Sequence, residues 1–481
     1  MSHQNCSNHD ICVYSFLPPA VRKPGRAEVP VSAPENTPHF AETVFPARGS
    51  TSVHPPLLVN HPQLALTLSE VVSFKPDDIL RAQVHIILAS IEHQIENICD
   101  NFLKTFNTWI PVVAESQIRK YITQVDKTSC PDICALILSI YLVTHTPATA
   151  CQSIDPAYYV LKRFHTSLHP SVETIQAGIL ISNYENGQGL DQETYLTIGS
   201  CARMGYALGM HTTLHQSSPS DTAAQAIFET HKQVWWCIVI MERVLALETI
   251  QSGLGRPFAC RDPLLSDHLP SFYGRGLGVE LPLGVSNNSA LPTFKPSNPF
   301  ARTAQATYIL SLVLSHITND YDGHESHSTQ VVYLDNMIQA FAFSALEQGN
   351  NDEHFAWGHS CGAFFIATCS LWILHEHNLA TSEKMKFGAA NRPNISSLAL
   401  RSLTRNMIET ARSKLNNQIS GAKFAPAFTL PCLQWGMKFH ITMKTESALD
   451  EEWLKDLEDM TIYLQIAGLK WKRASMFSII Y

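Results

Sequence analysis

Apolar residues in this chain recur at steps of three or four, the spacing of an α-helix. The clearest run begins near Ile79, has polar residues between its apolar members, and contains Leu80, Val84, Ile87, Ile91, Ile95 and Ile98. This spacing predicts one long helix with an apolar face. Alternating patterns of period two, which are typical of strands, are nearly absent. The sequence therefore predicts an all-α fold.

Start signals predict further helices along the chain. Asp191 is predicted to be an N-cap with the acid Glu193 in the first turn after it. Ser218 followed by Pro219 predicts a helix that continues through Trp235 to about Leu247. A stretch rich in Gly, Pro, Ser and Asn at 271–299 lacks periodicity and is predicted to be a surface loop. More helices are expected after it, at 301–317, 331–347, 355–377, 398–419, 430–443 and 450–475.

The chain has two parts that differ in composition. Nine prolines lie between Pro18 and Pro56, and the first 60 residues lack apolar periodicity, which is typical of disorder. We therefore expect a disordered lead-in over residues 1–70. The whole chain of 481 residues is 45% hydrophobic. Residues 71–481 can thus bury a sizeable core, and we predict one large multi-helix regulatory domain there.

Charge and cysteine usage narrow the expected partners. Lys and Arg number 34 against 42 Asp and Glu, so the chain has no excess positive charge to attract nucleic acid. The polar start at 1–10 does not resemble a secretory signal, and the longest apolar runs are shorter than the roughly 18–20 residues that span a membrane. The 12 cysteines are scattered and are expected to be reduced thiols. These features predict a soluble, intracellular protein with no membrane contact.

Several unusual strings follow one another in a fixed order between residues 171 and 270. They are VETIQAGIL at 172–180, GSCARMGYALGMH at 199–211, VWW ending in Trp235 and Trp236, MER ending in Glu242 and Arg243, the turn Gly255, Arg256 and Pro257, and then Asp262 and Pro270.

Each string has a physical use in a helical protein. Ala202, Gly205 and Gly209 recur at three and four, so another helix can approach closely. The two tryptophans supply large buried area; they could also line a ligand pocket, but core packing is the favoured interpretation. Arg243 is placed to reach an acidic group, and Pro257 favours a turn that leads the chain out of a helix pair.

Together these strings resemble the middle homology region of fungal zinc-cluster transcription factors, the fungal-specific transcription factor domain. Stretches at 106–113 and 469–474 are similar to the family's early element and final helix, so the resemblance runs from about residue 78 to the C-terminus. The chain departs from the family pattern in two places. Glu229 to Gln233 keeps the usual acid but only one firm cation, and Glu242 replaces the usual Asp.

The resemblance implies an all-α regulatory domain in a nuclear regulator of transcription. Members of the family commonly control metabolic genes, often in secondary-metabolite clusters. The resemblance also implies that the motif residues are structural or ligand-sensing, namely Trp235, Trp236, Glu242, Arg243, Gly255, Arg256 and Pro257. Of these, Arg256 could bind an anion or pair with Asp262 or Asp267.

The family normally carries a six-cysteine zinc cluster upstream of this region. Cys6 and Cys12 are the only cysteines in the first 98 residues, so we expect no zinc or other cofactor in this chain. DNA contact then comes from a partner, or from a module missing from a truncated gene model. The expected partners are a second copy, another transcription factor or a small-molecule effector.

Catalytic and metal-binding sets are not evident, which argues against an enzyme. His375 and His377 lie two apart, so a helix points them to different faces, and we expect them at a solvated helix end. Four cysteines at helical spacing are predicted to be buried thiols, namely Cys130, Cys134, Cys361 and Cys369. Phosphate-binding loops, nucleophile elbows and HExxH strings do not occur. The alternative is an α-helical small-molecule-binding protein, or an enzyme with an unrecognised pocket.

Overall fold

The computed structural model describes residues 76–124, 130–145, 154–214, 221–251, 258–263, 299–318, 324–351, 361–385, 395–417, 427, 429–442 and 451–477. All of them belong to one compact unit, Pro62–Tyr481. The predicted lead-in at 1–70 and the predicted loop at 271–299, except for Pro299, lie outside the described residues.

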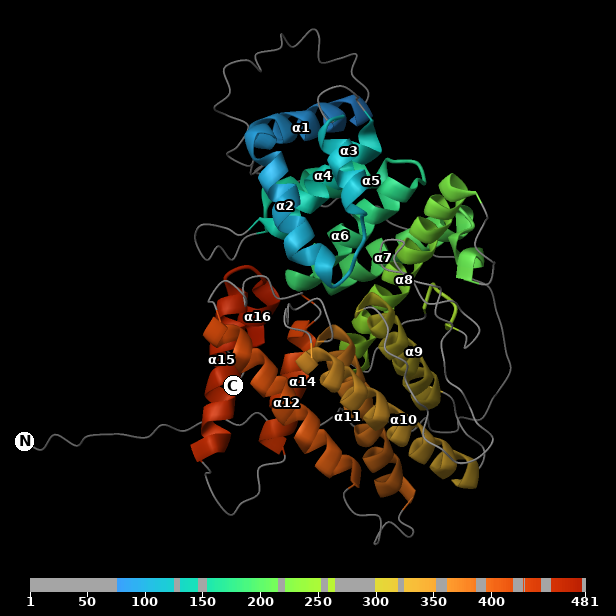
Figure 1. Ribbon diagram of the computed structural model, residues 1–481, viewed down its shortest axis with the longest axis vertical. Coiled ribbons are helices and arrows are strands. Elements are labelled where there is room, and N and C mark those ends of the chain that lie inside the picture. The colour runs from blue at the N-terminus through green and yellow to red at the C-terminus, as the bar shows by residue number, and fades with distance from the viewer. Residues whose placement is uncertain are drawn as a thin grey trace, which may run out of the picture. The chain divides into compact units, whose positions relative to one another are not determined.

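The described residues form helices and no strand, so the all-α prediction is confirmed (Figure 1). In the first half the helices are α1 (Pro76–Ile91), α2 (Ile95–Lys104), α3 (Glu115–Ile122), α4 (Pro131–Thr144), α5 (Pro156–Thr166), α6 (Val172–Gly187), α7 (Asp191–Ala207) and α8 (Thr222–Gln251). In the second half they are α9 (Pro299–Thr318), α10 (His324–Asn351), α11 (Cys361–Met385), α12 (Ile395–Asn417), α14 (Thr429–Thr442), α15 (Glu451–Gly468) and α16 (Lys472–Phe477).

Helix α6 lies at the centre of the first half. Its residues from Thr174 to Gly187 are all buried, and it contacts α4, α5, α7, α8 and α16. Helix α4 packs most extensively on it and is apolar nearly all round, with its residues buried from Ile133 to Ile140. A helix that is apolar on every side must be covered on every side, which explains why α4 lies inside the domain.

The first predicted helix is interrupted. A single 3₁₀ turn at Glu92–Gln94 separates α1 from α2, so the prediction of one continuous helix is wrong. The apolar face nevertheless continues through the break, since Ile91 and Ile95 are both buried. A 3₁₀ turn winds more tightly than an α-helix and therefore rotates the residues that follow. In this way α2 packs against α3 and α4, whereas α1 packs against α4 and α5.

One predicted helix start is corrected, and another lies outside the described residues. Asp191 does not cap α7: Leu190 is the N-cap residue, and the Asp191 carboxylate instead accepts a hydrogen bond from Arg473. Helix α8 begins at Thr222, where Asp221 Oδ2 accepts from the backbone N–H of Ala224 at 2.9 Å. A carboxylate satisfies one of the free N–H groups of a first turn, so the chain starts α8 there. The predicted start at Ser218 lies outside the described residues.

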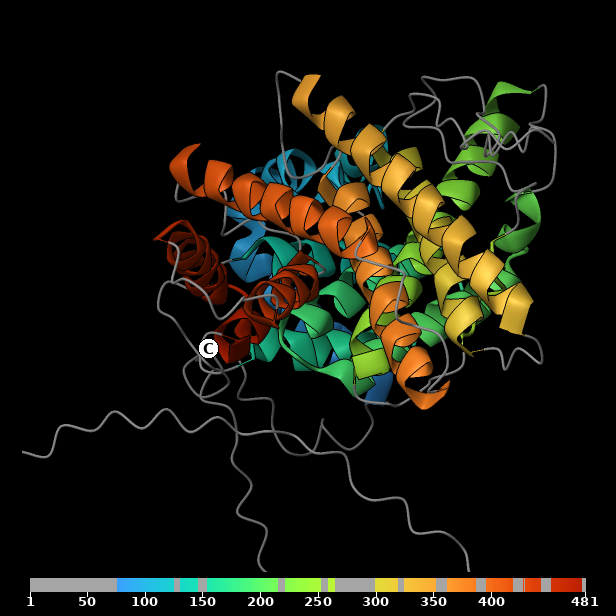
Figure 2. The same cartoon turned by 90° about the horizontal axis from the view of Figure 1, so that it is seen from below.

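The second half contains long helices close to the predicted ranges. Helix α11 packs against both α9 and α10 (Figure 2). It ends later than predicted, at Met385, and its predicted first residues, 355–360, lie outside the described residues. The predicted helix at 450–475 is in fact two helices, because α15 ends at Gly468 and α16 begins at Lys472. A Cβ on Gly468 would lie 2.5 Å from Ser475 Oγ, so a larger residue here would displace the Ser475 side chain.

No described helix is both long enough and apolar enough to cross a membrane.

Candidate functional site

The two tryptophans of the predicted motif lie in the core of α8. Trp235 is 1% exposed and Trp236 is fully buried. The ring of Trp235 meets that of Tyr206 edge-on, with centroids 4.9 Å apart. A Cβ on Gly205 would lie 2.9 Å from Trp235 Cζ3, so the predicted close approach at Gly205 is confirmed. Gly209 has a different role, because its φ of 69° turns the chain after α7. Among the described residues, no atom lies within 4 Å of where a Cβ on Gly209 would be.

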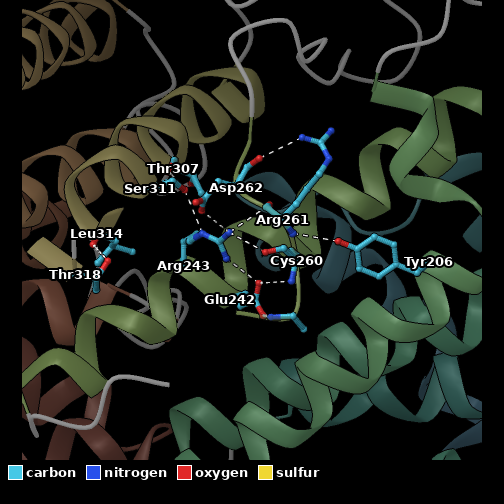
Figure 3. Close-up of polar contacts among 11 residues, drawn as sticks. Tyr206, Glu242, Arg243, Cys260, Arg261, Asp262, Thr307, Ser311, Leu314 and Thr318 are labelled. Carbon is cyan, nitrogen blue, oxygen red and sulfur yellow. Dashed lines mark hydrogen bonds and ion pairs between the residues drawn. The ribbon is translucent and has the colours of Figure 1, made fainter. Parts of the chain in front are cut away.

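Arg243 is the centre of a buried polar network (Figure 3). Its Nη1 donates to Glu242 Oε2 at 2.8 Å, and its Nη2 donates to Asp262 Oδ1 at 3.0 Å and to the carbonyl of Cys260 at 3.1 Å. Its Nε donates to Ser311 Oγ on α9 at 3.2 Å. The prediction that Arg243 reaches an acidic group is therefore confirmed.

Glu242 holds the same segment from the other side. Its carboxylate accepts the backbone N–H groups of Ala259, at 2.5 Å, and Cys260, at 3.1 Å. The ring of Phe258 lies 3.8 Å from the Arg243 guanidinium carbon, close enough for a cation–π contact. The hydroxyl of Tyr206 on α7 accepts from the backbone N–H of Arg261. We call Glu242, Arg243 and segment 258–263 the α8 clamp.

The hydrogen bonds of the α8 clamp indicate a structural role, because they hold separate elements together. All three guanidinium nitrogens of Arg243 donate to protein acceptors, and the residue is fully buried. It joins α8, segment 258–263 and α9, while Tyr206 adds α7. A substrate would have to displace these bonds to reach the guanidinium. The other predicted motif residues, Gly255, Arg256 and Pro257, lie outside the described residues.

A second buried cluster was not predicted from the sequence. Glu185 on α6 accepts hydrogen bonds from Lys162 at 2.5 Å, Tyr158 at 2.8 Å and Thr197 at 2.6 Å. Burial raises the pKa of Glu185, and the Lys162 ammonium opposes that rise. These residues link α5, α6 and α7. The sequence signal for this cluster was an acid, Glu185, in the last turn of a helix that is buried from Thr174 to Gly187.

The structure tests most of the predictions made for the cysteines and histidines. Cys134 and Cys369 are buried, and burial raises the pKa of the Cys134 thiol to about 11. Cys130 is half-buried and its Sγ donates to Asp132. Within the described ranges, no three His, Cys, Asp or Glu side chains are grouped to hold a metal. The described helix α11 runs on to Met385, so the prediction that His375 and His377 end a helix is wrong; both are half-buried.

An additional feature that the sequence did not reveal is a pocket of about 800 Å³ between α3, the start of α6 and the first half of α8. Its polar lining is held in place by a hydrogen-bonded row. The Tyr121 hydroxyl donates to Glu173, and Gln117 Nε2 donates to the Tyr121 hydroxyl at 2.7 Å. Burial, and secondly the bond to Glu173, raise the pKa of Tyr121. Gln117 and Tyr121 lie one turn apart on α3, but Glu173 is 52 to 56 positions away from them in sequence, so no local pattern predicted the row.

The match to a known family covers the part of the chain that contains the motif strings between residues 171 and 269. Residues 99–269 match the family described as fungal specific transcription factor domain, a range that covers the Trp pair, the α8 clamp and the pocket. The chain contains a fungal specific transcription factor domain. Within this range α4 and α6 are buried along most of their length, and the α8 clamp joins α8 to segment 258–263.

One curated relative of the transcription factor domain is similar over 114 residues at 25% identity. It is transcription factor BOA15 of Botryotinia fuckeliana strain B05.10, and the match covers 23% of this chain and 64% of that protein. The chain thus spans less than two thirds of the relative's length. No solved structure matches the chain.

Proposed function

We propose that this chain is a nuclear transcription regulator that controls a metabolic gene cluster of the secondary-metabolite kind. The fungal specific transcription factor domain at 99–269 carries this proposal, supported by a relative that is named a transcription factor. Four residues of the family motif are buried in α8, namely Trp235, Trp236, Glu242 and Arg243, which supports the proposal. The domain argues against an enzyme.

In the proposed mechanism the helical domain restrains or directs transcriptional activation. A small-molecule effector or a protein partner changes the state of the domain. DNA contact comes from a second factor or a second copy, or from a module outside this sequence. The chain itself carries no zinc cofactor in this proposal.

Small-molecule binding outside regulation is the second candidate, and the pocket between α3, α6 and α8 favours it. A binding protein of that kind would take up its ligand without changing transcription. The experiment below separates the two.

The test tethers the full chain to a heterologous DNA-binding domain and measures a reporter gene in a fungal cell. We expect reporter transcription to change several-fold relative to the DNA-binding domain alone, and the untethered chain to accumulate in the nucleus. Transcript profiling of a deletion strain should show neighbouring metabolic genes changing together. A tethered chain with no effect, in a cell where deletion changes no transcripts, would contradict the proposal.

A further inference from the structure

The pocket between α3, α6 and α8 contains an acid without a cationic partner. Glu173 Oε1 accepts hydrogen bonds from the Tyr121 hydroxyl and, at 3.4 Å, from Gln117 Nε2. In the described part of the chain, no Lys or Arg forms an ion pair with Glu173, and its Oε2 accepts no hydrogen bond. The carboxylate is therefore oriented by neutral donors and leaves one oxygen for another group.

The remaining charged groups around the pocket do not neutralise this carboxylate. Lys232 lies 2.9 Å from Glu229 Oε1 and is engaged with that acid. Burial lowers the pKa of His231, so its ring is neutral near pH 7. Lys120 is the cation in the lining itself, and it is exposed, so water and salt screen its charge.

The rest of the lining offers apolar surface at the scale of a small molecule. Ala114, Val172, Ala226 and Ile227 contribute to the pocket, and Ile227 is 60% exposed. A volume of about 800 Å³ lies within the usual range for ligand pockets, roughly 300–1,000 Å³. A ligand with one polar end and one apolar body would use both kinds of surface.

We propose that this pocket binds a small organic cation, a protonated amine on an apolar body. The amine donates a charge-assisted hydrogen bond to Glu173 Oε2, and the apolar body covers Ile227. Because Tyr121 and Gln117 already hold the carboxylate in place, little ordering is needed on binding. This inference rests on the proposed function in one respect: the ligand is the effector of the regulator.

The first test measures direct binding to the purified full chain by titration calorimetry at neutral pH. The probe is phenethylamine, and 3-phenylpropanoate is the matched compound of opposite charge. We expect saturable binding of phenethylamine and none of 3-phenylpropanoate. Glu173→Gln retains a carbonyl acceptor for Tyr121 but removes the charge, and should weaken binding about tenfold or more.

Glu96→Gln is the matched control for this change. Glu96 is the second residue of α2, as Glu173 is of α6, so each variant removes one acid from a first helical turn. Glu96 is exposed and lies outside the pocket lining, so its variant should bind phenethylamine like the wild type. Equal affinity of the wild type and the Glu173→Gln variant would overturn the proposal, as would equal binding of the anion or no saturable binding.

A steric pair makes the test independent of Glu173. Ala226 and Ala223 are both exposed on α8, but only Ala226 lines the pocket. Ala226→Phe should abolish phenethylamine binding, and Ala223→Phe should not. If both bind alike, the ligand does not occupy this pocket. If phenethylamine does not bind but the tethered chain still changes reporter transcription, the effector-site proposal is wrong and the proposed function is unaffected.

Discussion

The side chain of Arg243 holds three separate parts of the chain together. Its guanidinium is fully buried, yet it joins α8 to segment 258–263 and to Ser311 on α9. A buried charge without its partners is costly, so the clamp depends on every member. Glu242 shares the task, because its carboxylate accepts two backbone N–H groups of the same segment.

Replacing Arg243 by Met should destabilise the chain by about 3–5 kcal/mol, because Glu242 then remains buried without its cation. Urea unfolding followed by tryptophan fluorescence measures this loss. Arg203→Met, an exposed position on α7, is the control and should change stability by less than about 0.5 kcal/mol. A loss for Arg243→Met no larger than that of the control would mean that the clamp does not hold the segment.

Two glycines on α7 should respond to alanine with opposite signs. A Cβ on Gly205 would press on the Trp235 ring at 2.9 Å, so Gly205→Ala should cost about 1–3 kcal/mol. A Cβ on Gly199 would meet only the end of Arg203, at 3.7 Å, so Gly199→Ala should stabilise by about 0.5–1 kcal/mol. Thermal unfolding of both variants measures the sign of each stability change. A gain of stability in the Gly205→Ala variant would contradict the prediction.

At the scale of elements, the short helix α16 fastens the end of α6. Arg473 Nε donates to the carbonyl of Asn186 at 2.7 Å, and Gln188 donates to the carbonyl of Lys470 at 3.2 Å. The ring of Trp471 lies directly over Gly187, where a Cβ would fall 2.1 Å from Cε3. The last helices therefore complete the packing of a helix that lies 282 residues or more before them.

Gly187→Ala should release α16 without removing any polar contact, because the new methyl group takes the place of the Trp471 ring. We expect amides in 472–477 to exchange with deuterium about tenfold faster or more, since a clash of this size costs on the order of 1–3 kcal/mol. Gly436→Ala on α14 is the matched control, as its Cβ would meet the flexible end of Met407 at 3.4 Å and Thr404 Cγ2 at an ordinary 3.8 Å. Unchanged exchange in the Gly187 variant would show that the contact is adaptable.

At the scale of the whole molecule, the stability of the fold should depend on a buried lysine near its end. Lys470 is 8% exposed, and burial lowers its pKa from the usual 10.5 to about 7. The unfolded chain therefore binds a proton that the folded chain lacks between pH 7 and 10. Over this range the group makes the free energy of unfolding increase with pH, so its contribution is lost progressively as pH falls from about 10 to 7.

Lys470→Met tests this by removing the group. The difference in unfolding free energy between wild type and variant should shift in favour of the wild type by up to about 1.4 kcal/mol per pH unit from pH 7 to pH 9. Urea unfolding at several pH values measures it, and the comparison cancels the titration of the cysteines. A difference that does not vary with pH would mean that the Lys470 ammonium keeps its ordinary pKa in the fold.

The sequence by itself determined the helical class, the burial of the Trp pair, the close approach at Gly205 and the need of Arg243 for an acid. These follow from local spacing and from the cost of leaving large apolar or charged groups unpaired. Only the tertiary structure decided that Asp262 and Glu242 are the partners of Arg243, that Glu173 faces a pocket, and that Trp471 fills the space over Gly187. Such contacts join helices far apart in the chain, and helix periodicity says which face is buried but not what covers it. The breaks after Ile91 and Gly468 escaped prediction for the same reason, since the apolar spacing continues across each turn.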